Sequence, residues 1–147
     1  AMSGTKKVLV QAPCVGIDFG TQTSSVAVYR NETAEVVAND QGTHFTPSVV
    51  GFAENELLVG DVAVSGRVKN PTNTVVECKR LLGKKISDED VQKDAQRWPY
   101  KLVTNQEGKA CPQVDYKKGT TAFTPEQLCG FVLKNIKATV EASVHTP

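Results

Sequence analysis

The feature that most constrains the fold is a strand, a glycine turn and a second strand near the start of the chain. Apolar residues alternate with small or polar ones over Cys14–Phe19, which predicts a β-strand. Gly-Thr-Gln-Thr at 20–23 then forms a turn, and Ser25–Arg30 is a second β-rich run. A further turn at 31–32 leads to a third predicted strand, Ala34–Ala38. Short strands at such tight spacing predict an antiparallel meander.

The rest of the chain predicts short strands and helices followed by one long helix. Thr124-Pro125-Glu126-Gln127 is a capping box with proline at the first helical position, which is typical of a helix start. The predicted elements are strands at 48–53 and 56–59, helices at 61–69, 72–82 and 87–98, a hairpin of 101–103 with 111–114, and a helix from 124 to the end of the chain. The fold class is therefore mixed α/β.

The turn after the first strand is the first candidate for chemistry. Gly20 lets another group approach the backbone closely, and successive N–H groups in such a turn form a concavity suited to phosphate. Asp18, just before the turn, could hold a magnesium ion through water. A plain hairpin with a solvated aspartate is the alternative.

Lys79 is the second candidate. On the predicted helix over 72–82 it shares a face with Val75, Val76 and Leu82, whereas Glu77 and Arg80 would project elsewhere. A lysine on an apolar face either reaches outward to water or points at an anion in a cleft. The spacing leaves both open.

Charge and hydropathy exclude several classes of partner. The 17 basic and 16 acidic residues give a net charge of +1, which provides no clustered positive charge for nucleic acid or an anionic membrane. No apolar run approaches the roughly 20 residues that span a bilayer. The apolar run at 8–10 is too short for a secretory signal, so residues 1–13 are predicted to be a leader with a cloning remnant and the protein to be cytoplasmic.

The cysteines and histidines do not predict a metal site. The cysteines do not form a Cys-x-x-Cys pair, and the two histidines are isolated. Without a secretory signal, free buried thiols in a reducing compartment are the expectation. These thiols are at Cys14, Cys78, Cys111 and Cys129.

Several motifs taken together resemble a known family. VGIDFGTQTSSVAVY resembles the first phosphate loop of the actin-like ATPase superfamily. The segments VVANDQGTHFTPSVVGF, VGDVA, KNPTNTV, CKRLLGKK and WPYKLV, in this order, are similar to the seventy-kilodalton heat-shock chaperones (DnaK-type). The resemblance runs from about Val15 to about Ala142. It implies an actin-like ATPase (ribonuclease H-like) fold with an incomplete first lobe: an opening sheet at about 14–45, an upper subdomain at about 46–123 and a long helix at about 124–143.

The resemblance also implies roles for both candidates. Asp18 matches an aspartate that binds Mg²⁺ through water, and Lys79 matches the lysine that positions the attacking water and stabilises charge at the γ-phosphate. The residues matching the loop around the β- and γ-phosphates are Gly20, Thr21, Gln22 and Thr23. The family usually has threonine at position 22 and alanine at position 78, so this is a divergent member.

The implied function is that of an ATPase chaperone that uses ATP, ADP and Mg²⁺. Its partners would be unfolded polypeptides, J-domain proteins and nucleotide-exchange co-chaperones. A related large co-chaperone with little turnover is the alternative, and TPSVV and NPTNTV argue against a small-molecule kinase. Alone, this 147-residue chain is expected to be inactive, to bind ATP weakly, and to self-associate through the open edge of its first strand.

Overall fold

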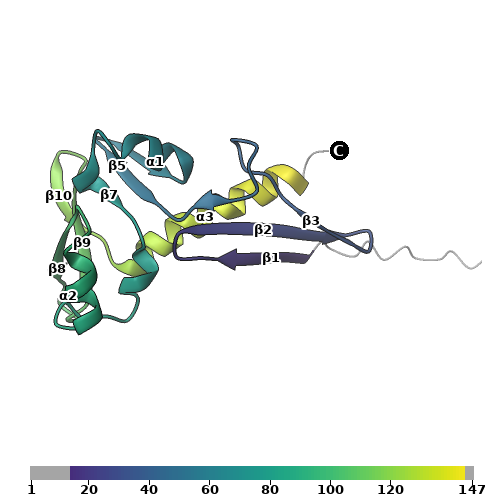
Figure 1. The fold of residues 1–147 in the computed structure, drawn as a ribbon. Coiled ribbons are helices and arrows are strands. Elements are labelled where there is room, and N and C mark those ends of the chain that lie inside the picture. Colours follow the sequence, from purple (N-terminus) through teal and green to yellow (C-terminus); the bar gives the residue numbers. More distant parts are fainter. Residues whose placement is uncertain (1–13, 145–147) are drawn as a thin grey trace, which may run out of the picture.

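The structure is a computed structural model that describes residues 14–144, and its elements follow the order β-meander, mixed segment, long helix (Figure 1). The strands are β1 Cys14–Phe19, β2 Thr23–Arg30, β3 Thr33–Val36, β4 Thr46–Pro47, β5 Val50–Ala53, β6 Glu56–Val59, β7 Thr74–Val75, β8 Lys101–Thr104, β9 Ala110–Tyr116 and β10 Gly119–Ala122. The helices are α1 Asp61–Gly66, α2 Glu89–Ala95 and α3 Pro125–Val144, with 3-10 turns η1 Pro71–Asn73 and η2 Cys78–Leu81. The predictions for residues 1–13 lie outside the described range.

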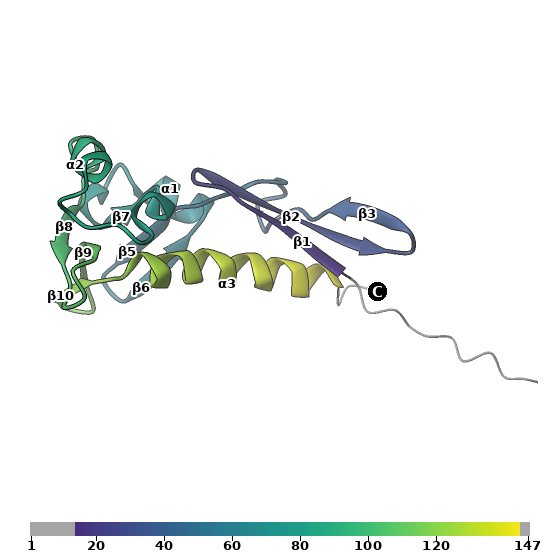
Figure 2. The same ribbon diagram turned by 90° about the horizontal axis from the view of Figure 1, so that it is seen from below.

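Within residues 14–144 the strands form three antiparallel sheets. The first has the order β1-β2-β3 with β4 paired to β2, and the others have the orders β6-β5-β7 and β10-β9-β8. Figure 2 shows the two smaller sheets with α1 and α2 at one end, the long β1–β2 hairpin at the other, and α3 running along both. The predicted meander and the mixed α/β class are confirmed.

Helix α3 joins the two ends of the molecule. Thr124 accepts a hydrogen bond from the Gln127 amide (3.2 Å), and the Gln127 side chain accepts one from the Thr124 amide (2.9 Å), so the predicted capping box is formed. Leu128, Val132 and Ile136 follow at intervals of four residues and are almost fully buried. This stripe is the face that α3 presents to the core.

An aromatic cluster fastens the small sheets to α3. The ring of Phe52 in β5 stacks on Phe123 at 4.6 Å and meets Tyr116 of β9 edge-on at 5.3 Å. Phe123 in turn meets Phe131 of α3 edge-on at 5.8 Å. Aromatic pairs at these distances add about 0.5–1.5 kcal/mol each beyond the area they bury.

The predicted helix over 72–82 is wrong. That segment is η1, the short strand β7 and η2, because Thr74 and Val75 pair with Gly51 and Val50 of β5. β-Branched residues favour a pleated, buried position, and here tertiary pairing decides over the helical spacing of apolar residues. Glu77, at φ 55°, then turns the backbone out of the strand direction.

Smaller differences occur at other elements. The predicted strand at 48–53 is shorter, as β5 Val50–Ala53, and the preceding β4 Thr46–Pro47 was not predicted. Helix α1 ends at Gly66 instead of near Lys69. β10 was not predicted, because the turn before it uses two lysines at positive φ, Lys117 (52°) and Lys118 (62°), in place of the usual glycine or asparagine. No helix in the described part of the chain is long and apolar enough to cross a membrane.

Candidate functional site

The turn between β1 and β2 is built around Gly20. A Cβ added at Gly20 would lie 2.1 Å from the carbonyl oxygen of Thr23, far inside any allowed contact. Glycine is therefore required by the closure of the turn itself. The two halves of the turn approach each other at this point, and phosphate binding by the turn stays a prediction.

Ser48, between β4 and β5, holds the turn in place through two hydrogen bonds. Its hydroxyl donates to the Gly20 carbonyl (2.9 Å), and its amide donates to the Gln22 carbonyl (2.8 Å). The Ser48 hydroxyl has one proton and donates it to the Gly20 carbonyl. The Ser24 hydroxyl must therefore donate to the Ser48 oxygen (2.9 Å). Both serines are 1% exposed. Sequence reasoning missed Ser48; the signal was a lone serine in the apolar TPSVV segment.

Asp18 lies on β1 opposite Ser25, one residue before Phe19 and the turn, and its carboxylate is exposed. In the described range no three His, Cys, Asp or Glu side chains gather as a metal cluster. A single carboxylate beside a phosphate loop fits Mg²⁺, which keeps several waters and takes the remaining ligands from phosphate oxygens. The role of Asp18 stays a prediction.

Lys79, on η2, reaches the base of the same turn. Its ammonium donates to the carbonyl of Phe19 and lies 4.9 Å from the centre of the Phe19 ring. The two candidates, 60 residues apart, thus meet in space, although the helical face on which Lys79 was predicted to lie does not exist. Lys79 is half-buried and directed at the loop. The alternative, a lysine that extends outward into water, therefore does not apply.

The left-handed backbone of Glu77 directs the chain into η2, which carries Lys79. Glu77 was expected to project away from the core, yet it is 9% exposed. Its carboxylate accepts a hydrogen bond from the Trp98 indole (3.2 Å) and forms ion pairs with Arg97 (2.8 Å) and Arg80 (3.4 Å). A left-handed backbone is uncommon for glutamate, and these three partners over-determine it. Nothing in a single sequence marks such a residue.

A cleft of about 320 Å³ lies beside the loop. Thr21, Gln22 and Ser48 form one wall, and Arg67 contributes positive charge. Arg97 also lines the cleft, but its charge is paired with the carboxylate of Glu77, which lines the cleft too. Gln22 and Thr23 are exposed on the loop. The cleft therefore places one cationic side chain, that of Arg67, and one ion pair next to the candidate phosphate loop.

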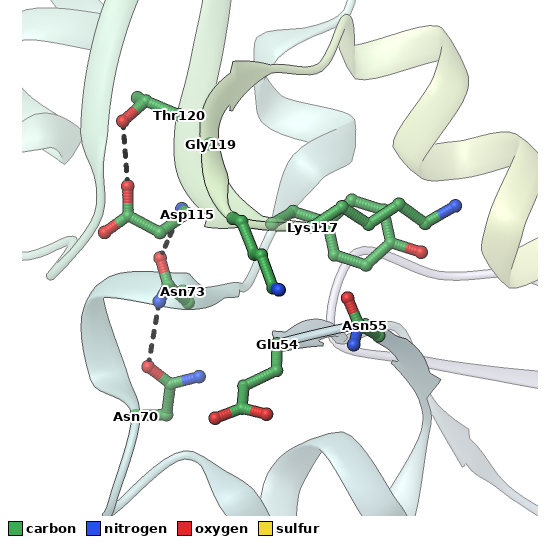
Figure 3. A pocket seen from close by; sticks show the side chains of 10 residues that line it. Glu54, Asn55, Asn70, Asn73, Asp115, Lys117, Gly119 and Thr120 are labelled. Carbon is green, nitrogen blue, oxygen red and sulfur yellow. Dashed lines mark hydrogen bonds between the residues drawn. The ribbon is translucent and has the colours of Figure 1, made fainter.

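A larger pocket of about 550 Å³, drawn in Figure 3, is lined by none of these residues. It lies between the β5–β6 turn, η1 and the β9–β10 turn. Several of its polar groups bond to one another. Asn73 donates to Asn70 (3.0 Å) and accepts from the Asp115 amide (2.8 Å), and Thr120 donates to the Asp115 carboxylate (2.9 Å). We interpret it as a structural junction, because its lining includes neither Lys79 nor the phosphate loop.

Comparison with known proteins identifies the group to which this site belongs. Residues 14–147 match the model of the family described as Hsp70 protein. The chain is 47% identical over 131 residues to the heat shock 70 kDa protein of Neurospora crassa, covering 89% of this chain and 20% of the relative. It is 45% identical over 134 residues to heat shock cognate 70 kDa protein 3 of Dictyostelium discoideum, covering 90% and 21%.

A third relative is a ribosome-associated molecular chaperone of Zygosaccharomyces rouxii, with 42% identity over 130 residues, covering 88% of this chain and 21% of the relative. The chain therefore spans about a fifth of the length of these relatives. Its mixed α/β architecture with antiparallel sheets is consistent with a partial actin-like ATPase lobe.

Proposed function

The chain belongs to the Hsp70 protein family, and we propose that it is the ATP-binding part of a chaperone that couples ATP hydrolysis to the binding and release of unfolded polypeptides. The observation that carries the proposal is the contact between the Lys79 ammonium and the Phe19 carbonyl at the base of the turn. It brings a cation to the turn that we propose as the phosphate-binding loop. Phosphoryl transfer requires such positioned charge and little covalent chemistry from the protein.

We assign the roles within the site as follows. Gly20–Thr23 bind the β- and γ-phosphates of ATP or ADP through backbone N–H groups. Asp18 holds Mg²⁺ through water, and the ion would supply neutralisation of phosphate charge. Lys79 orients the attacking water and stabilises negative charge at the γ-phosphate. Ser48 keeps the loop closed while these groups act.

The partners and location follow from the same proposal. We propose J-domain and nucleotide-exchange co-chaperones as partners and the cytoplasm as the location. A nucleotide-binding co-chaperone with little turnover is the second candidate, favoured by glutamine at position 22 and cysteine at position 78. An intact parent protein that binds ATP without hydrolysing it would decide for this second candidate.

We also propose that this chain self-associates through β1. In residues 14–144 β1 pairs only with β2, and Val15 and Ile17 are each 46% exposed. A strand with one unpaired edge and exposed apolar side chains favours edge-to-edge association. Light scattering of the 147-residue chain over a concentration series should show a rising mass. A constant monomer mass would refute this proposal.

The role of Lys79 is tested by single-turnover ATP hydrolysis in the full-length parent protein. Lys79→Ala should leave ATP binding nearly intact and slow hydrolysis at least tenfold, or roughly 1.4 kcal/mol of transition-state stabilisation. Lys85→Ala, at an exposed lysine in the same region, is the matched control and should hydrolyse ATP at the parent rate. Equal rates for the Lys79 and Lys85 variants would remove Lys79 from the mechanism.

A further inference from the structure

Two thiols, those of Cys78 and Cys129, contact each other next to the candidate catalytic lysine. Cys78, the first residue of η2, and Cys129, in the first turns of α3, have their Sγ atoms 3.7 Å apart. They are separated by 51 residues in the sequence, and their side chains are buried, with 1% and 6% of each residue exposed. Both are free thiols.

The distance between the two sulfur atoms is not far above that of a disulfide bond. A disulfide has its sulfur atoms about 2.05 Å apart, so an approach of under about 2 Å separates the two states. Cys111 is also buried and free, but no sulfur contact involves it in the described residues. Cys111 therefore provides an internal comparison for burial without a second sulfur nearby.

The surroundings assign different roles to the two sulfurs. The hydrogen bond shared with Cys78 lowers the pKa of Cys129, and the positive charge of Lys79 lowers it further, against the opposing effect of burial. The same hydrogen bond and burial raise the pKa of Cys78. Both directions favour Cys129 over Cys78 as the attacking sulfur.

We propose that Cys78 and Cys129 form a redox site at which a hydroperoxide converts the thiol pair into a disulfide linking η2 to α3. The Cys129 thiolate attacks the hydroperoxide; an S–O bond forms, the O–O bond breaks, and the alkoxide or hydroxide leaves and takes up the proton that Cys129 released. The Cys78 sulfur then attacks the sulfenic sulfur, its proton leaves with the hydroxyl as water, and the S–S bond forms. Two thiols are oxidised and one hydroperoxide is reduced.

Oxidation would act on the proposed ATP site. Cys78 immediately precedes Lys79, and the Lys79 ammonium contacts the phosphate loop at Phe19. Drawing Cys78 toward α3 moves the backbone that carries Lys79. It also removes the thiolate form of Cys129, whose negative charge interacts with that lysine. This consequence depends on the proposed function, whereas formation of the disulfide does not.

The disulfide is tested on the 147-residue chain with hydrogen peroxide, followed by alkylation and peptide mapping. The exposed Cys14 is replaced by Ser in every sample. We expect the loss of two titratable thiols and a linked peptide pair containing Cys78 and Cys129, with Cys111 still alkylated. The control Cys111→Ser should give the same link.

A second variant identifies the attacking sulfur without requiring the link. In Cys78→Ser, Cys129 should stop at the sulfenic acid and be trapped by a cyclic diketone. Retention of both thiols, or oxidation of Cys111 at the same rate as Cys129, would overturn the redox site. In the parent protein, a mapped link with unchanged ATP turnover would overturn only the coupling to Lys79.

Discussion

Glu77 offers the sharpest test of how the backbone carries Lys79 to the loop. Its carboxylate is buried, with a side chain 11% exposed, and it binds Trp98, Arg97 and Arg80. Glu77→Gln keeps an acceptor for the Trp98 indole and removes the charge. Glu77→Ala removes both. The two variants therefore separate the ion pairs from the buried hydrogen bond.

The expected sizes follow from these contacts. Arg97 and Arg80 have side chains about half exposed, so each ion pair is discounted for solvent and contributes about 0.5–1 kcal/mol. Glu77→Gln should therefore cost about 1–2 kcal/mol. Glu77→Ala also leaves the indole N–H of Trp98, which is 7% exposed, without its acceptor, at a further cost of about 1–3 kcal/mol.

Urea denaturation of the 147-residue chain measures both values, since a change in midpoint at constant slope reports stability. Glu107→Ala is the matched control: that glutamate is 69% exposed and pairs only at the surface with Lys109, so its loss should cost under about 0.5 kcal/mol. If Glu77→Ala is no less stable than Glu77→Gln, the Trp98 hydrogen bond does not hold this segment and the reasoning is refuted.

Three further predictions concern the loop, the long helix and alkaline pH. Gly20→Ala should lower the free energy of thermal unfolding by about 1–3 kcal/mol, because its Cβ would lie 2.1 Å from the Thr23 carbonyl. Gly16→Ala is the control, because no atom lies within 4 Å of the added Cβ and no such clash occurs. Thr124→Ala should lose about 1 kcal/mol in urea unfolding through the missing cap, and an unchanged midpoint would contradict this. Burial raises the pKa of Tyr100 above its usual 10.0, so the folded state holds this proton more tightly and stability should fall as pH rises above about 10; Tyr100→Phe should weaken that decline, and an identical pH profile would contradict it.

The parts of the fold that local sequence determines were predicted. The β1–β2 hairpin has strict alternation around a glycine turn, and α3 has both a capping box and an apolar stripe at helical spacing. The segment 72–82 was not predicted correctly, because its apolar residues satisfy helical spacing while their burial comes from pairing with β5. A single sequence does not contain that non-local competition.

The candidate site shows the same division. Asp18 and Gly20–Thr23 are close together in the sequence, so their proximity in space could be predicted from it. The approach of Lys79 to Phe19 spans 60 residues and depends on β7 and η2, which spacing did not predict. Ser48 and Glu77 support the site through buried hydrogen bonds, which leave no pattern in composition or periodicity.

The central claim is that nucleotide phosphate and its metal bind at the turn after β1. Its most direct test is an amide NMR spectrum of the 147-residue chain titrated with Mn²⁺–ATP, with Mn²⁺ alone as the control, since paramagnetic broadening detects even weak binding by position. We predict that the amide signals of residues 18–23 and of Lys79 broaden first, and only when nucleotide is present. Broadening that begins at residues 115–120 of the larger polar pocket, with 18–23 unchanged, would contradict the account.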